Sequence, residues 1–203
     1  DKDVTLDLNG KTVTEGNNIY QIFYVKSGTL TLTDSDGGAK VECLGENSGK
    51  CIYVSSGATL TIHGGRFYSA TGSVLQTDSG TEALITGGDF STSHNYVVGN
   101  DGKLTVSGGN FTAGKWFAIT TGGTLILNGG SFTAGENGTV GYYGGVLDVS
   151  GHPDPLGISM KNYDRANLPF PSGQVTVTLS DGNILLPAGY AVMDTNGTAV
   201  TEL

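Results

Sequence analysis

The feature that most constrains this chain is a four-residue motif, Gly-Gly-x-Phe, which recurs at nearly constant intervals. Successive copies are separated by 23, 21 and 21 residues. A unit this short cannot bury an apolar face alone, so the repeat predicts an array of stacked units. The four copies are Gly64-Gly65-Arg66-Phe67, Gly87-Gly88-Asp89-Phe90, Gly108-Gly109-Asn110-Phe111 and Gly129-Gly130-Ser131-Phe132.

Each unit contains three short runs of alternating apolar residues. One run directly precedes the glycine pair, as in Leu60-Thr61-Ile62, another lies several residues earlier, and the third starts at the phenylalanine. Alternation with period two is typical of β-strands, and the repeat region lacks the helical period. Weaker copies of the first run at Leu6-Asp7-Leu8, Leu30-Thr31-Leu32 and Leu147-Asp148-Val149 extend the array.

Stacking places each strand beside its copy in the next unit, about 4.8 Å away, in three parallel sheets. The predicted fold is therefore all-β: a single-stranded, right-handed parallel β-helix of about seven rungs. The four motif phenylalanines should form one interior stack. A second interior column is expected from Leu8, Leu32, Ile62, Ile85, Val106, Leu127 and Val149.

The pattern divides the chain into two parts of one domain. Residues 1–152 carry the rungs, whereas four prolines follow Gly151 within about twenty residues and the glycine-pair motif stops. Residues 153–203 are expected to form an irregular, β-rich C-terminal cap. A stacked array needs such a cap, because an open sheet edge recruits other chains.

The composition limits the classes of molecule that this chain is expected to bind. Ten Lys and Arg residues against 19 Asp and Glu residues give a formal net charge of −9. An acidic chain is a poor ligand for nucleic acids, and no apolar run is long enough to insert into a membrane. The 34 glycines suit corners where the backbone needs positive φ.

Three segments resemble the pectin-lyase-like β-helix domains of secreted bacterial surface proteins. They are residues 4–13 and 27–34, and the ending around 184–197. The repeated Leu-x-Val/Ile-x-Gly-Gly-x-Phe pattern is similar to the same domains. The resemblance implies an extracellular or cell-surface location and an adhesin-like or rigid-spacer role, in a monomeric module of a larger protein. It implies shape rather than lyase activity.

A polysaccharide lyase or hydrolase is the alternative function. Such enzymes need several acidic and basic side chains that converge on one outward patch. The outward column between the interior leucines reads Asp7, Thr31, Thr61, Leu84, Thr105, Ile126 and Asp148. Its two acids lie at opposite ends, so a non-catalytic module without cofactor is favoured.

Metal binding is not expected from the histidines or from the one acidic turn. His63, His94 and His152 occupy different positions in their units, which favours isolated surface side chains. The segment Asp34-Ser35-Asp36-Gly37-Gly38 lacks the distal glutamate of a calcium loop.

The only two cysteines, Cys43 and Cys51, bracket the one long insertion between units. A disulfide between them is favoured for an exported protein, and two free thiols are the other interpretation.

Binding is expected on an apolar stripe that alternation places outside. Counting seven residues back from each interior leucine gives Phe23, Tyr53, Gln76, Val97 and Ala118, with Trp116 nearby. Exposed apolar stripes mark partners, so Tyr53, Val97 and Trp116 are the candidate contacts for a glycan or a protein. The other interpretation is that these residues merely form strands.

Overall fold

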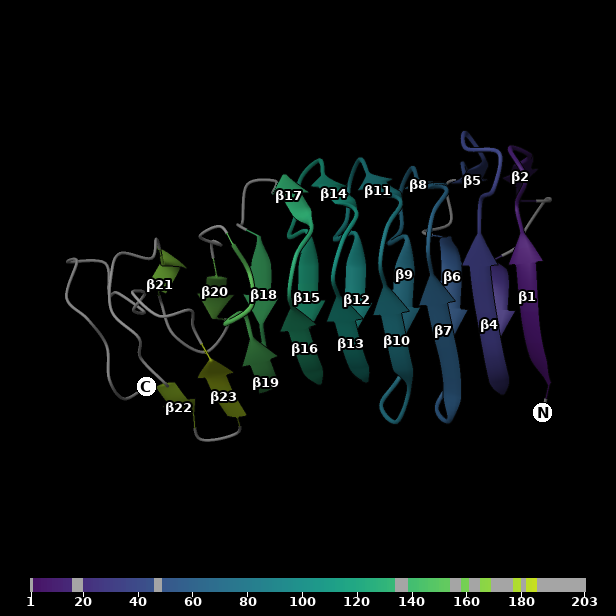
Figure 1. Ribbon diagram of the computed structural model, residues 1–203. Coiled ribbons are helices and arrows are strands. Elements are labelled where there is room, and N and C mark those ends of the chain that lie inside the picture. The colour runs from purple at the N-terminus through teal and green to yellow at the C-terminus, as the bar shows by residue number, and fades with distance from the viewer. Residues whose placement is uncertain are drawn as a thin grey trace.

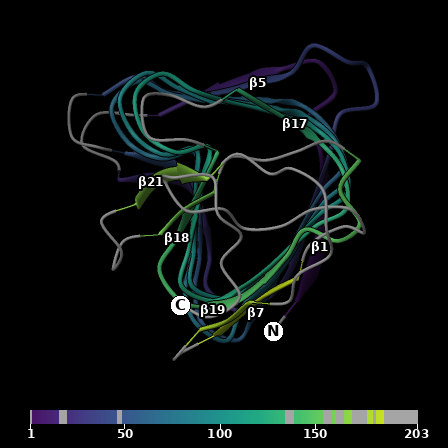
Figure 2. The same cartoon turned by 90° about the vertical axis from the view of Figure 1, so that its left-hand side faces the viewer.

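The protein is a β-solenoid in which the chain visits three parallel sheets in turn and winds through about six turns. This computed structural model describes residues 2–15, 20–45, 49–133 and 139–153, and the backbone of four later strands. Figure 1 shows the rungs side by side, and in the axial view of Figure 2 they superimpose in a three-sided outline. The prediction of an all-β parallel solenoid is confirmed, with a rung count close to the expected seven.

Each of the three sheets collects one strand from almost every rung, and each is named here with its strands in spatial order. Sheet A contains β1 (Asp3–Asp7), β4 (Gly28–Thr33), β7 (Ala58–Ile62), β10 (Glu82–Ile85), β13 (Lys103–Val106), β16 (Thr124–Leu127), β19 (Gly145–Asp148), β23 (Gly182–Leu185) and β22 (Val177–Leu179). Sheet B contains β17 (Ser131–Thr133), β14 (Asn110–Ala113), β11 (Asp89–Thr92), β8 (Arg66–Ser69), β5 (Lys40–Cys43) and β2 (Thr12–Thr14). Sheet C contains β21 (Arg165–Leu168), β20 (Ile158–Met160), β18 (Val140–Tyr142), β15 (Ile119–Thr121), β12 (Val98–Asn100), β9 (Leu75–Thr77), β6 (Lys50–Val54) and β3 (Gln21–Val25).

Parallel stacking continues past residue 152. Strand β20 pairs parallel with β18, and β23 pairs parallel with β19. Each is followed at the sheet end by an antiparallel neighbour, β21 and β22 respectively. Most of the segment 154–203 lies outside the described residues, so the boundary at residue 152 and the irregular cap stay predictions.

The interior columns of sheet A follow the predicted register except at the first rung. Leu32, Ile62 and Ile85 are paired in neighbouring strands and fully buried. Leu6, rather than Leu8, pairs with Leu32, although Leu8 is buried as expected and Leu6 is 37% exposed. The same two-residue shift puts Thr5, not Asp7, at the start of the outward column.

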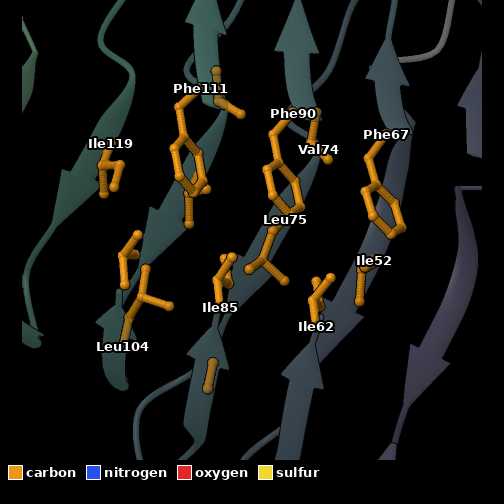
Figure 3. Packing of buried hydrophobic residues seen from close by; sticks show 14 of the residues in the cluster. Ile52, Ile62, Phe67, Val74, Leu75, Ile85, Phe90, Leu104, Phe111 and Ile119 are labelled. Atoms are coloured by element: carbon orange, nitrogen blue, oxygen red, sulfur yellow. The ribbon is translucent and has the colours of Figure 1, made fainter. Parts of the chain in front are cut away.

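The phenylalanines of the motif form a continuous stack through the core. Figure 3 shows the rings of Phe67, Phe90 and Phe111 in one row above the aliphatic side chains of sheets A and C. Ring centroids are 5.1, 4.8 and 5.0 Å apart from Phe67 to Phe132, with interplanar angles of 6°, 8° and 15°. The first three rings are buried and Phe132, near the last rungs, is half-buried. The predicted stack is thus confirmed.

The glycine pair before each phenylalanine turns the chain from sheet A to sheet B. The second glycine has positive φ in all four copies, as with +112° at Gly88. At the first glycine the constraint is a close approach between rungs, because a Cβ atom on Gly87 would lie 2.7 Å from the carbonyl oxygen of His63. Three of the four corners, those at Gly87, Gly108 and Gly129, therefore need glycine at both positions, for two different reasons.

Gly64 and Gly87 provide a matched test of this close approach. We expect Gly87→Ala to lower the free energy of unfolding by about 1–3 kcal/mol, because a backbone carbonyl must move. At Gly64 the nearest atom to an added Cβ is the Cβ of Asp34, at an ordinary 3.8 Å. Gly64→Ala should therefore change stability by less than about 0.5 kcal/mol. Urea denaturation of both variants checks this, and equal losses would contradict the explanation.

A buried polar column runs inside the solenoid where sheet C ends. Thr77, Asn100 and Thr121 are paired in register and nearly inaccessible to solvent. The Thr77 hydroxyl donates to Asn100 Oδ1 at 2.9 Å, and Asn100 Nδ2 donates to Thr121 Oγ1 at 3.0 Å. Asn100 Nδ2 also reaches the carbonyl oxygens of Gly102 and Thr124. One amide thus links three rungs.

Candidate functional site

The outer face of sheet C carries the most distinctive side chains of the described surface. Its outward column follows the register Tyr24, Tyr53, Gln76, Gly99, Thr120 and Gly141. Tyr24 and Tyr53 meet edge to face, with ring centroids 5.5 Å apart and planes at 62°. Tyr24 is 55% exposed, so this pair presents aromatic surface to solvent.

Aromatic residues from the loops cover the two glycines of this column. The Tyr96 ring packs so closely on Gly99 that a Cβ there would lie 2.8 Å from it. Its hydroxyl donates to Gln76 Oε1 at 3.1 Å. Phe117 lies over Gly141 in the same way, with 2.8 Å to the site of a Cβ. Because glycine has no side chain, the rings of Tyr96 and Phe117 can pack directly against the backbone of the sheet at these two outward positions.

Two aspartates lie beside these rings on neighbouring rungs. Asp78 and Asp101 directly follow β9 and β12, and their preceding residues are register partners. Their backbones are therefore about 4.8 Å apart. The Tyr53 hydroxyl donates to both oxygens of Asp78, at 2.7 and 2.8 Å. This hydrogen bond, with burial and the charge of Asp78, raises the pKa of Tyr53 to about 12.

Tyr96 and Tyr143 complete the group. Burial raises the pKa of Tyr96, and the nearby Asp101 and Tyr143 contribute to the rise. Tyr143 follows β18 and is 38% exposed. We call the set Tyr24, Tyr53, Tyr96, Tyr143, Asp78 and Asp101 the tyrosine–aspartate face.

No lysine or arginine neutralises the two aspartates in the described part of the chain. Its ion pairs are Arg66–Asp89 at 3.5 Å, on sheet B, and Lys103–Glu82 at 2.9 Å, on sheet A. Asp101 is exposed and Asp78 half-buried. The face therefore combines aromatic rings with negative charge that no lysine or arginine among the described residues balances.

The predicted binding stripe is only partly on the surface. Tyr53 faces outward as expected, and Trp116 is 46% exposed in the loop after β14. Val97, however, is fully buried, so its assignment to an outward stripe was wrong. The turn from β9 to β10 spans residues 78–81, whereas the turn from β12 to β13 spans only 101–102. Counting back from Leu104 across the shorter turn therefore misplaces the outward residue, which is Gly99 and not Val97.

Cys43 and Cys51 are free thiols rather than the favoured disulfide, and both are buried. They lie in different sheets, on β5 and β6. The Cys43 thiol donates to Glu15 Oε2, and the Cys51 thiol to the carbonyl oxygen of Tyr68. Burial raises both pKa values, that of Cys43 to about 12 with a contribution from Glu15.

These thiols should resist alkylation in the folded protein. Thiolate is the reactive form, and a raised pKa together with burial suppresses it at neutral pH. We expect iodoacetamide to leave both cysteines unmodified in native buffer and to modify both in denaturant, as measured by intact mass. A mass lower by two hydrogen atoms, with no modification after unfolding, would instead establish a disulfide.

Asp34 and the three histidines, which were considered above as possible metal ligands, make contacts within the fold. Asp34 accepts backbone hydrogen bonds from Gly10 and Ala39, at 2.8 and 2.9 Å. His63 contacts Thr86 Oγ1, and His94 contacts the carbonyl oxygen of Ala70. His152 is buried against Phe132, so it is not the surface side chain expected. Among the described residues no group of three or more His, Cys, Asp or Glu side chains is arranged to hold a metal ion.

Besides a groove of about 300 Å³ on sheet A, two larger open grooves lie on the described surface. One, of about 470 Å³, follows the glycine corner beside Arg66 and Asp89. Most of its glycines are already explained by a positive φ or by the close approach of the rungs. The other, of about 460 Å³, lies at the first rung between Leu6 and Tyr24. There Val4 and Leu6 are 49% and 37% exposed, because no described strand covers β1 on that side.

Comparison with known proteins adds no relative. No protein-family model matches the chain, and neither the curated proteins nor the solved structures contain a match. Within the described residues, no helix has the length and apolar character of a membrane span. The functional conclusion therefore depends on the geometry of the tyrosine–aspartate face.

Proposed function

We propose that this protein is a non-catalytic, extracellular β-helix module of the pectin-lyase-like kind, which binds an extended glycan along the outer face of sheet C. The observation that carries the proposal is the tyrosine–aspartate face itself. Exposed aromatic rings with a polar tip suit sugar rings, whose two sides are apolar and whose edges carry hydroxyl groups. The adhesin-like role and cell-surface location are supported by the sequence resemblance.

The spacing of the rungs favours an extended polymer over a compact ligand. Neighbouring rungs are about 4.8 Å apart, which is close to the length of one sugar residue. A glycan lying parallel to the solenoid axis would therefore meet an equivalent position on each rung. Contacts from one or two rings give a dissociation constant of about 0.1–1 mM, and several bound sugars are needed for tighter binding.

Tyrosine substitutions on two faces test this function. We expect Tyr53→Ala to weaken binding of cell-wall or plant polysaccharides at least fivefold, because it removes the ring that contacts Tyr24 and orients Asp78. Tyr68→Ala is the matched control, since Tyr68 lies on sheet B and hydrogen-bonds Ser93. Affinity electrophoresis in polysaccharide gels measures both. Equal weakening, or a glycan that binds both variants as well as the parent chain, would place the site elsewhere.

The alternative of a polysaccharide-active enzyme gains one observation from the same face. Asp78 and Asp101 are carboxylates on adjacent rungs, and glycoside hydrolysis uses two carboxylates that flank the bond to be cleaved. The hydroxyl of Tyr53 occupies both oxygens of Asp78, which disfavours that role. New reducing ends or unsaturated products after incubation with a bound polysaccharide would favour the enzyme.

A further inference from the structure

The charge of the tyrosine–aspartate face narrows the class of glycan. Neutral sugars can donate hydroxyl hydrogen bonds to carboxylates, but a protonated amine also neutralises their charge. Here Asp78 and Asp101 lie on consecutive rungs, and the described ion pairs of the protein involve neither of them. The chain as a whole carries a net charge of −9, so long-range attraction also favours a cation.

The tyrosine rings of this face also favour a cationic ligand. A cation held near the face of a tyrosine ring is attracted by the ring electrons, and nearby carboxylates strengthen that attraction. Tyr53 is hydrogen-bonded to Asp78, and Tyr96 lies within the electrostatic influence of Asp101. Each carboxylate is thus accompanied by an aromatic ring on the same outer surface of sheet C.

A polymer with one amine on each sugar would place its charges at intervals similar to the rung spacing of about 4.8 Å. We therefore propose that the tyrosine–aspartate face binds a glycan of amino sugars whose amines are free and protonated. Asp78 and Asp101 pair with the ammonium groups of two successive sugars, and the tyrosine rings stack on the faces of those and the neighbouring sugars. This inference rests on the proposed glycan-binding function and names its substrate class.

Three oligosaccharides of equal length test the charge directly. They are β-1,4-linked oligomers of glucosamine, of N-acetylglucosamine and of glucose, titrated into the protein by isothermal calorimetry below the pKa of the free amine. We expect the glucosamine oligomer to bind at least tenfold more tightly than the other two. Raising the salt from about 0.05 to about 0.5 M should remove most of that preference, because exposed charges are screened.

Aspartate variants locate the effect. We expect the double variant Asp78→Asn, Asp101→Asn to lose at least tenfold in affinity for the glucosamine oligomer and to change little toward the neutral oligomers. Glu82→Gln is the control, because it removes an exposed carboxylate from sheet A, where Glu82 pairs with Lys103. Thermal unfolding of each variant shows whether the fold is retained. Tyr53→Phe separates the hydroxyl that orients Asp78 from the ring that stacks.

The outcomes separate the two proposals. If the three oligomers bind equally and the aspartate variants behave like the parent chain, the charge inference is wrong and the glycan-binding function stands. If none of the three binds, while polysaccharides still bind in gels, the inference is again wrong. If no glycan binds in either assay, both proposals fail. A lysine-rich peptide that binds the face more tightly than the glucosamine oligomer would make it a protein-binding surface and overturn the inference.

Discussion

Replacing Phe111 by alanine is expected to lower the free energy of unfolding by about 3–5 kcal/mol. The ring is fully buried and stacks on both sides, 4.8 Å from Phe90 and 5.0 Å from Phe132. Its removal leaves a cavity that the rigid rungs above and below cannot close, because the strands are held at their spacing by backbone hydrogen bonds. Urea denaturation followed by far-ultraviolet circular dichroism measures the loss.

Phe132 is the matched control for this experiment. It occupies the same repeat position but is only half-buried, and its second neighbour is His152 at a tilted 5.7 Å. We expect Phe132→Ala to cost clearly less than Phe111→Ala, because fewer contacts are lost and solvent can fill the space. Equal effects, or a loss near zero for Phe111→Ala, would contradict the role assigned to the stack.

Asn100→Val is expected to have the second-largest effect, about 2–4 kcal/mol of destabilisation. The amide of Asn100 hydrogen-bonds the hydroxyl groups of Thr77 and Thr121 and the carbonyl oxygens of two further residues, Gly102 and Thr124. All of these groups are at or near the buried interior. Valine fits the column, since Val25 and Val54 fill it in earlier rungs. The cost therefore comes from buried polar groups that lose their partner, each of which amounts to about 1–3 kcal/mol.

A triple variant distinguishes lost hydrogen bonds from lost packing. Replacing Thr77, Asn100 and Thr121 together by valine removes the hydroxyl groups along with the amide. We expect this variant to be more stable than Asn100→Val alone, because an apolar column leaves fewer orphaned groups. Thermal unfolding of the single and triple variants compares them, and a further loss in the triple variant would show that packing around Asn100 dominates.

The core of the fold could be predicted because it is specified by residues that repeat in register. The phenylalanine of each motif has one position relative to the glycine pair, so its stack follows once the units are aligned. The same holds for the alternating residues of sheet A from β4 onward. The first rung could not be aligned in this way, because Leu6 and Leu8 both fit the alternation. Only the strand pairing shows which of them lies beside Leu32.

The outer face of sheet C could be predicted only in part. Tyr53 was found because it precedes Leu60 by seven residues, just as Gln76 precedes Ala83. Val97 was misplaced because the turn after β12 is two residues shorter than the turn after β9. Tyr96 and Phe117 lie in loops, where alternation gives no direction. The available signal was glycine at the strand positions 99 and 141, since glycine in a strand often marks a close approach by another group.

The cysteines illustrate a different limit. Their spacing is compatible with a disulfide or with two separate thiols, and the deciding facts are three-dimensional. Cys43 lies beside Glu15 from the preceding rung, and Cys51 beside the carbonyl oxygen of Tyr68. Neither neighbour is adjacent in sequence, so no local pattern could reveal them.

The turns between sheets C and A differ in length from rung to rung, while the stacked strands on either side stay in register. One rung uses four residues at this corner and the next uses two, yet the columns on both sides remain in register. Lengthening a flexible surface turn costs little, about 0.6 kcal/mol for each doubling. Insertions at this corner would therefore leave the stacked interior intact while changing what stands next to Asp78 and Asp101. Chains with the same stacked rungs could therefore differ in the ligand they bind by changing only the turns between sheets C and A.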